Sequence, residues 1–340
     1  MKYLTAARLT GTLLVMSILL VAAVVFGLVL GPSRLAPSEV FAQLLSSGQE
    51  GAAADIVWRI RLPRVLLAMQ VGAALATAGV IFQALLRNPL ADPFVLGVSG
   101  GAALGAIAMM ALGASLGFGY AAVPPAAFAG CVATTFLLYA IAGLHGRVSA
   151  TPLLLTGVVF NAFASAAIIF LASLAGLNEG SRIFLWLIGS LSVGRSDMIG
   201  WLASFLVLGL ACSIPFTRDL NLLALGDESA GQLGVAVERH KRILLLSTSL
   251  MVGAAVSVAG LVGFVGLIIP HLLRLVLGPD HRLLVPAAAL GGAAFLVVCD
   301  TLARTLLDGR ELPVGAITAI LGGPLFLVLL RRHHRQVFAS

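Results

Sequence analysis

The chain has 340 residues, of which 60% are hydrophobic and only 10% are charged, and its mean hydropathy is +1.07. Soluble domains carry charge on about a quarter of their residues, so this composition argues against a soluble enzyme and against a disordered chain. The net charge of +7 indicates basic loops facing an anionic membrane leaflet, whereas in a soluble protein it would suggest nucleic acid.

Uninterrupted apolar segments of about 20 residues predict membrane-spanning helices. Residues 93–146 are expected to form two spans, because a Gly-rich stretch and a Pro-Pro pair interrupt them. Residues 243–273 are expected to form one full span and a shorter one, because glycines and Pro270 interrupt the apolar run. The total is ten spans, or nine if that pair is one bent helix. Single spans are expected over residues 9–33, 65–86, 148–178, 198–217, 283–303 and 312–330.

The basic residues predict the orientation. With ten spans and an inside N-terminus, 13 of the 21 Lys and Arg residues lie on the inner side and eight lie outside. Both termini are therefore expected in the cytoplasm. Arg59, Arg61 and Arg64 depart from this trend, because all three gather in one outer loop.

A short internal repeat points to two related halves. Residues 71–79 (VGAALATAG) recur as residues 252–260 (VGAAVSVAG), and a basic cluster precedes each copy. The copies fall in the second and seventh expected spans, so they run in opposite directions, as in the inverted repeats of transporters. Close helix packing also favours small-residue faces in unrelated membrane proteins, so chance recurrence stays open as the alternative. The sequence predicts an all-α polytopic membrane protein, a single domain over residues 1–340, with spans 2–5 and 7–10 as inverted halves.

Few residues suggest chemistry. Residues 97–101 match the Gly-x-Ser-x-Gly pattern, and His271 could act as the base for Ser99, but a nucleophile elbow needs a strand-turn-helix that a helical membrane chain does not provide. A packed helix start is therefore favoured over an intramembrane protease. The sequence has no Walker-type ATP motif and no metal-ligand spacing, so no catalytic residue, metal or cofactor is expected on this chain. Asp300 and Arg304 lie one helical turn apart and are expected to form an ion pair.

Residues 219–235 form an amphipathic segment between spans six and seven, on the inner side. The segment is too charged to insert, and Gly226 is expected to break it into two short helices with Asp227 and Glu228 at the start of the second. Because the other loops are short, a docking surface for a partner is favoured over an ordinary loop.

Several motifs occur together in one known family. They are RLPR at 61–64, RNPLADP at 87–93, LGVSGGA at 96–102, WLIGSL at 186–191, LALGD at 223–227, GFVGLIIPH at 263–271 and ELPVG at 311–315. With these motifs, the chain from about residue 55 to 331 resembles the FecCD-type permeases. These are the membrane subunits of type II ATP-binding-cassette importers for iron chelates, haem and cobalamin.

The resemblance implies the partners of the chain. They are a second copy of the chain, two cytoplasmic ATPase subunits that bind ATP and Mg, and a periplasmic or lipid-anchored substrate-binding protein that docks from outside. The resemblance also assigns the segment 219–235 as the coupling helices that contact the ATPases. The coupling residues within this segment are Leu223, Ala224, Leu225, Gly226, Asp227 and Glu228.

The resemblance implies two further sets of site residues. Arg61, Arg64 and Arg304 match positions that meet acidic residues of the binding protein, which would account for the basic cluster outside. The gate or pathway residues are Asn88, Leu90, Ala150 and Thr151.

The sequence therefore predicts an importer permease of the bacterial inner membrane, for an iron-siderophore complex, haem or cobalamin. The alternative is a secondary transporter driven by an ion gradient, which also uses inverted repeats. That class needs carboxylates in the middle of its spans, whereas nearly every Asp and Glu here lies at a span end or in a loop.

Overall fold

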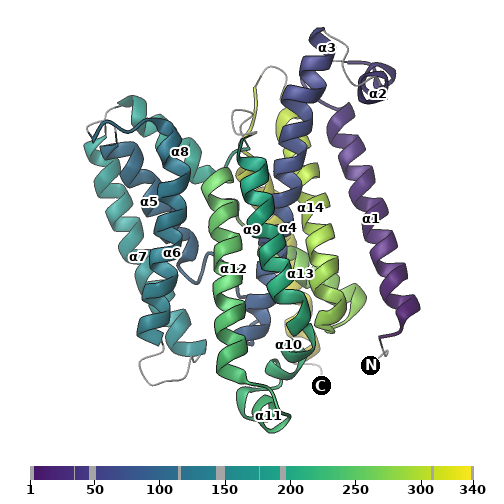
Figure 1. The fold of residues 1–340 in the computed structure, drawn as a ribbon, viewed down its shortest axis with the longest axis vertical. Helices are drawn as coiled ribbons and strands as arrows, with labels where there is room; N and C mark the ends of the chain where they lie inside the picture. The colour runs from purple at the N-terminus through teal and green to yellow at the C-terminus, as the bar shows by residue number, and fades with distance from the viewer. Residues whose placement is uncertain are drawn as a thin grey trace.

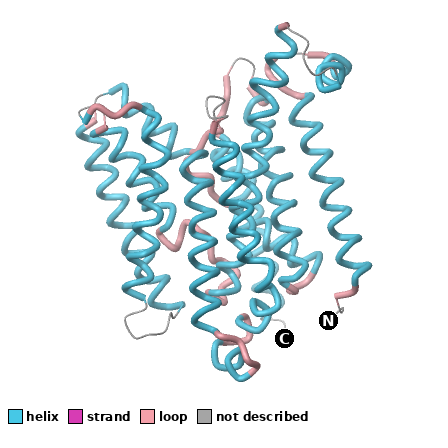
Figure 2. The backbone as a smooth tube through the Cα atoms, in the orientation of Figure 1, coloured by secondary structure: helices cyan, strands magenta, loops and turns pink. Residues whose placement is uncertain are grey.

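The computed structural model of the chain is a bundle of helices (Figures 1 and 2). It describes residues 4–33, 35–45, 51–113, 116–142, 150–175, 177–191, 197–307 and 310–337. Within these ranges the chain forms helices, turns and loops without a strand, which confirms the predicted all-α class.

Seven helical stretches are long and apolar enough to cross a membrane. Three shorter apolar helical stretches accompany them: α5 (Val98–Leu112), α13 (Val265–Leu277) and the part Val314–Leu327 of α15 (Val314–Val337). The polytopic membrane architecture is thereby confirmed, while the number of ten spans stays a prediction. The seven stretches are α1 (Ala6–Val29), α3 to α4 (Ala52–Leu85), η3 to α6 (Tyr120–Ala142), α7 (Ala150–Leu174), α9 to α10 (Met198–Leu223), α12 (Val237–Ala259) and α14 (His281–Thr305).

The helices form two groups (Figure 1). Helices α5, α6 (Val123–Ala142) and α7 make one group, and helices α1, α4 (Leu62–Leu85), α9, α12, α13 and α14 make the other. Helix α12 packs against α5 and α6, and so joins the groups along a seam. The start of α1 lies at the same end of the bundle as the short helices α10 (Thr217–Leu223) and α11 (Asp227–Gln232), here called the α11 end. The short helix α2 (Pro37–Leu45) lies at the opposite end, here called the α2 end.

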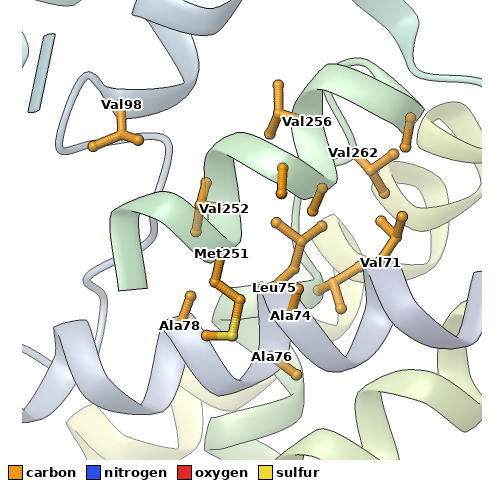
Figure 3. Packing of buried hydrophobic residues seen from close by; sticks show 14 of the residues in the cluster. Val71, Ala74, Leu75, Ala76, Ala78, Val98, Met251, Val252, Val256 and Val262 are labelled. Atoms are coloured by element: carbon orange, nitrogen blue, oxygen red, sulfur yellow. The ribbon is translucent and has the colours of Figure 1, made fainter. Parts of the chain in front are cut away.

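Helices α4 and α12 form the core and carry the two repeat copies. In the apolar window of each helix 83% and 78% of the residues are buried, compared with 17% in α1 and α7. The two helices run in opposite directions (Figure 1), and Val71 and Leu75 of one copy pack in the same cluster as Val252 and Val256 of the other (Figure 3). The opposite directions agree with an inverted repeat, but the relation between whole halves stays a prediction.

Glycines bring the core helices close together. A Cβ atom added at Gly72 of α4 would overlap the carbonyl oxygen of Gly292 in α14, and one added at Gly292 would overlap that of Gly72. Gly79 faces the carbonyl oxygen of Gly266 in α13 in the same way. Membrane helices associate through close packing, because lipid tails are as apolar as the helices themselves. These glycines therefore set how near α13 and α14 approach α4.

We expect Gly72→Ala to destabilise the fold and Gly11→Ala in α1 to leave it unchanged or slightly more stable. The methyl group at position 72 forces α4 away from α14, and overpacking of this kind costs about 1–3 kcal/mol. A Cβ at Gly11 has no atom within 4 Å, so alanine there only improves helix propensity. Equilibrium unfolding in mixed detergent and SDS, followed by circular dichroism, measures both variants. Equal stabilities would contradict the close α4–α14 contact.

Candidate functional site

A buried network of charges joins α4 to α14 at the α2 end. Arg64 Nε lies 2.9 Å from Asp300 Oδ1, and Arg304 Nε lies 3.0 Å from Asp300 Oδ2. Arg64 also reaches Glu311, whose Oε2 lies 2.7 Å from its Nη1. The predicted pair of Asp300 and Arg304 is confirmed, and it forms the centre of a larger network.

Arg61 belongs to the same region but binds main-chain oxygens. Its Nη1 donates to the carbonyl oxygen of Leu28 at 2.6 Å, and its Nη2 donates to that of Ser33 at 2.5 Å. Arg304 Nη2 donates to the carbonyl oxygen of Gly27 at 3.2 Å. The last four carbonyl groups of a helix lack hydrogen-bond partners within it. The hydrogen bonds from Arg61 and Arg304 therefore supply partners for carbonyl groups at the end of α1 and join this helix to α4 and α14.

The three arginines expected to meet a binding protein are buried in this structure. Arg61, Arg64 and Arg304 are only 1%, 3% and 4% exposed. Exposed charges at the same end include Asp55, Arg59 and Glu311, with 58%, 82% and 55% of their side chains accessible. In this structure the three arginines hold the α2 end together, and their role in docking stays a prediction.

The segment expected to contact an ATPase forms two short helices at the α11 end. Helices α10 and α11 are separated at Gly226, which confirms the predicted break. Gly226 has a φ of +123°, a conformation that glycine adopts far more readily than other residues. Asp227 and Glu228 stand in the first turn of α11, as expected.

The six predicted coupling residues differ in exposure. Ala224, Leu225 and Glu228 are exposed, and Asp227 is half-buried. Leu223 and Gly226 are buried. The outer face of this segment is therefore the side that a partner could reach.

Side chains fasten the two short helices to the starts of α12 and α14. Asp227 of α11 pairs with Lys241 of α12, whose side chain is only 5% exposed. Asn221 of α10 donates to Asp280 Oδ1 at 2.9 Å and accepts a hydrogen bond from the backbone N–H of His281 at 2.9 Å. Asp280 is the N-cap of α14, and hydrogen bonds from Arg282 hold the pKa of Asp280 below its usual range.

The predicted gate residues lie in two separate places. Asn88 Oδ1 accepts a hydrogen bond from the N–H of Leu90 at 2.9 Å, which closes a tight turn just after α4, and Leu90 is exposed. Ala150 and Thr151 are the first two residues of α7. No hydrogen bond between described residues joins the two places, so a shared gate stays a prediction.

Arg87, in the segment 86–97, lies beside the turn between the short helices, and the sequence reasoning did not single it out as a site residue. It follows α4 with a φ of +49°, which is uncommon for residues other than glycine. Its Nη1 lies 3.4 Å from the position of a Cβ on Gly226. Farther along the segment, Asn161 of α7 donates to the carbonyl oxygen of Phe94 at 2.7 Å. The segment thus contacts both the α10–α11 turn and the other helix group.

In the part of the chain that the structure describes, no base forms a hydrogen bond with the hydroxyl group of Ser99, the possible nucleophile. Residues 97–101 form the start of α5, as the packing interpretation predicts, and Ser99 is only 1% exposed. Among the described residues, no group of three or more His, Cys, Asp and Glu side chains could hold a metal ion.

Known proteins similar to this chain include transport permeases. The model of the FecCD transport family matches residues 19–332. The chain is 45% identical over 294 residues to the cobalamin import system permease protein of Halobacterium salinarum, covering 86% of this chain and 77% of that protein. It is 43% identical over 289 residues to the hemin transport system permease protein of Yersinia pestis, covering 83% of this chain and 86% of that protein. A solved inward-facing structure of a metal-chelate type ABC transporter has a TM-score of 0.82 and 29% identity, covering 95% of this chain and 99% of that one.

We expect Asp300→Asn to destabilise the fold by about 3–5 kcal/mol, because it leaves Arg64 and Arg304 buried without their shared carboxylate. The matched control is Asp55→Asn, which breaks the exposed pair with Arg59 at the same end. Exposed pairs contribute little, so the control should unfold like the unmodified chain. Tryptophan fluorescence during an SDS titration measures both variants. A stability of Asp300→Asn close to that of the control would contradict the structural role of the network.

Proposed function

The chain belongs to the FecCD transport family, and from this we propose that it is the permease subunit of an ATP-binding-cassette importer. Its substrate would be an iron chelate, haem or cobalamin. Two separate ATPase subunits would bind ATP and Mg²⁺, and a second copy of the chain would complete the pathway. The observation that carries the proposal is the likeness, over more than four fifths of the chain, to permeases of cobalamin and hemin.

The α11 end supplies a suitable surface for the ATPase. Leu225 is 69% exposed and Leu233 is 61% exposed, on either side of the exposed Glu228. Apolar side chains exposed together on a segment too charged to insert favour a contact with another protein. We therefore place the α11 end, and with it the start of α1, in the cytoplasm.

Three connections would pass a movement of the short helices into the bundle. Lys241 ties α11 to α12, and Asn221 ties α10 to α14. Arg87, which directly precedes the predicted gate residue Asn88, lies beside the turn at Gly226 and would supply the third connection. Asp300 lies 20 residues beyond Asp280, so α14 would carry a displacement over about 30 Å to Asp300. This is the rigid-body motion by which alternating access opens a path to one side at a time.

The α2 end would receive the substrate-binding protein. The network there balances Arg64 and Arg304 against Asp300 and Glu311, and the nearby Arg61 binds only main-chain and hydroxyl oxygens. The region around the network thus holds one more buried arginine than carboxylates, which would favour an acidic group from a partner. Glu311 is the carboxylate that such a group would replace, because more than half of its side chain is exposed. The ion-driven alternative has less support, because two arginines already hold Asp300.

We expect uptake of cobalamin, haem or a ferric siderophore into proteoliposomes to require ATP and to be blocked by vanadate, when the chain is reconstituted with its ATPase and binding protein. Leu225→Ser should weaken ATPase binding at least about tenfold, because a buried leucine side chain contributes about 1.5–3 kcal/mol. The matched control is Leu45→Ser, which changes a leucine that is 87% exposed in α2 at the opposite end.

Copurification of the ATPase and uptake per ATP hydrolysed are the two measurements. Uptake that follows an ion gradient and ignores vanadate would contradict the importer proposal. Equal ATPase binding by the two leucine variants would contradict only the contact at the α11 end.

We expect Glu311→Gln to strengthen docking of the binding protein severalfold at low salt, because it frees Arg64 Nη1 for an acid of the partner. The control is Glu39→Gln in α2, which removes the same charge from the same end; among the described residues Glu39 forms no ion pair and accepts a hydrogen bond from the N–H of Ala36. Surface plasmon resonance with the chain in nanodiscs, at two salt concentrations, measures both affinities. An equal gain in both variants would show that Arg64 does not meet the partner.

A further inference from the structure

The segment between α4 and α5 holds its shape through its own side chains. Asn88 Oδ1 accepts a hydrogen bond from the N–H of Leu90 at 2.9 Å, and Asp92 Oδ1 accepts one from the N–H of Phe94 at 2.8 Å. Asparagine and aspartate commonly close turns in this way, by bonding to the backbone two residues farther on. Residues 88–94 therefore form two consecutive turns of defined shape, here called the double turn.

Helix α7 holds the double turn through Asn161. Its Nδ2 donates to the carbonyl oxygen of Phe94 at 2.7 Å. Since Asp92 holds the N–H of Phe94, side chains bind both backbone polar groups of this residue. Asn161 also lies against α5, because a Cβ atom added at Gly100 would overlap its Oδ1. The half-buried Asn161 thus fits between the double turn and the first turn of α5.

A glycine lets the backbone come this close to α7. Gly157 lies one helical turn before Asn161, and a Cβ atom added there would lie 2.8 Å from the carbonyl oxygen of Val95, the residue after the double turn. Small residues allow such close approach between the elements of a membrane protein. Because the backbone of Val95 rests directly on α7, the short side chain of Asn161 can reach Phe94.

The hydrogen bond of Asn161 lies between the two places that hold the predicted gate residues. Asn88 and Leu90 belong to the double turn itself. Ala150 and Thr151 begin α7, and Thr151 precedes Asn161 by ten residues, or about 15 Å along the helix. The bond therefore joins the turn that carries one pair of these residues to the helix that carries the other pair.

We propose that Asn161 is a positioning residue that makes α7 follow the double turn, so that the two pairs of predicted gate residues shift together. The inference rests on the proposed importer function, in which motion of the short helices reaches the double turn beside Arg87. Lipid tails and apolar side chains offer Asn161 and the carbonyl group of Phe94 no other hydrogen-bond partner, so the bond resists their separation. Without it, the double turn would move while α7 stays behind.

The test compares Asn161→Leu with Ser173→Ala in the chain reconstituted with its ATPase and binding protein in proteoliposomes. Leucine is close to asparagine in size but donates no hydrogen bond. The control removes a hydrogen bond that stays within α7, from Ser173 Oγ to the carbonyl oxygen of Phe170 at 2.7 Å. Radiolabelled cobalamin, haem and a ferric siderophore are the three transport probes.

We expect Asn161→Leu to lower uptake per ATP hydrolysed about threefold, which is the shift in equilibrium that one hydrogen bond inside a membrane protein produces. The rate of ATP hydrolysis should stay unchanged, because Asn161 lies beyond the ATPase contact. Ser173→Ala should match the unmodified chain in both measurements.

Hydrogen exchange of the chain alone in nanodiscs tests the contact itself. The amides of residues 88–94 should exchange about threefold faster in Asn161→Leu than in Ser173→Ala or the unmodified chain. If Asn161→Leu does not fold, Asn161→Asp takes its place in both measurements. Aspartate has the same size, and its ionised carboxylate has no hydrogen to donate to Phe94.

Three outcomes overturn the proposal. Equal uptake per ATP hydrolysed in Asn161→Leu and Ser173→Ala would remove the positioning role. A parallel fall of uptake and ATP hydrolysis would show that Asn161 only supports the fold. Equal exchange in the two variants would show that α7 does not hold the double turn.

Failure of the proposed importer function gives a different result. The unmodified chain itself would then show no vanadate-sensitive uptake of any probe, and the positioning role would fall with that function. Hydrogen exchange would still show whether Asn161 holds the double turn.

Discussion

Lipid tails offer no hydrogen bonds, so charged groups inside the bundle must be satisfied by the chain itself, and Asp300 meets this constraint for two arginines. Its two carboxylate oxygens hold Arg64 of α4 and Arg304 of α14 side by side. The same two helices come into close backbone contact at Gly72 and Gly292, where neither has a side chain. The ion pairs at the α2 end and the backbone contact between Gly72 and Gly292 thus hold α4 against α14. Helices α1, α12 and α13 pack around this pair.

The success of the sequence reasoning depended on the distance along the chain. The break at Gly226 and the pair of Asp300 and Arg304 follow from neighbours within one helical turn, and both are present. The burial of Arg64 could not be predicted in this way, because its partner Asp300 lies 236 residues farther along. Arginines between two apolar spans suggest a solvated loop until the fold brings carbonyl groups and a carboxylate within reach. The bond of Asn221 to Asp280 spans 59 residues and escaped prediction for the same reason.

The contacts of the short helices at the α11 end give a route by which their motion would reach the rest of the bundle in the proposed importer. The ion pair of Asp227 and the hydrogen bond of Asn221 join the short helices at the α11 end to the bundle, and Arg87 lies beside the turn at Gly226. Two of these contacts enter the core helices α12 and α14, and the third meets the segment after α4. In the proposed importer, one motion would therefore reach the gate segment and the far end of α14 together.

The long separation between Arg64 and Asp300 also has a consequence for synthesis. Arg61 follows α1 by about 30 residues and can satisfy the end of that helix as soon as both have left the ribosome. Arg64 must wait for another 236 residues, which takes roughly ten to fifty seconds at about 5–20 residues per second. During that interval α4 holds a guanidinium group without its carboxylate. The nascent chain would therefore keep the first turn of α4 near water or the insertion machinery, and α4 would settle into the bilayer only when α14 arrives.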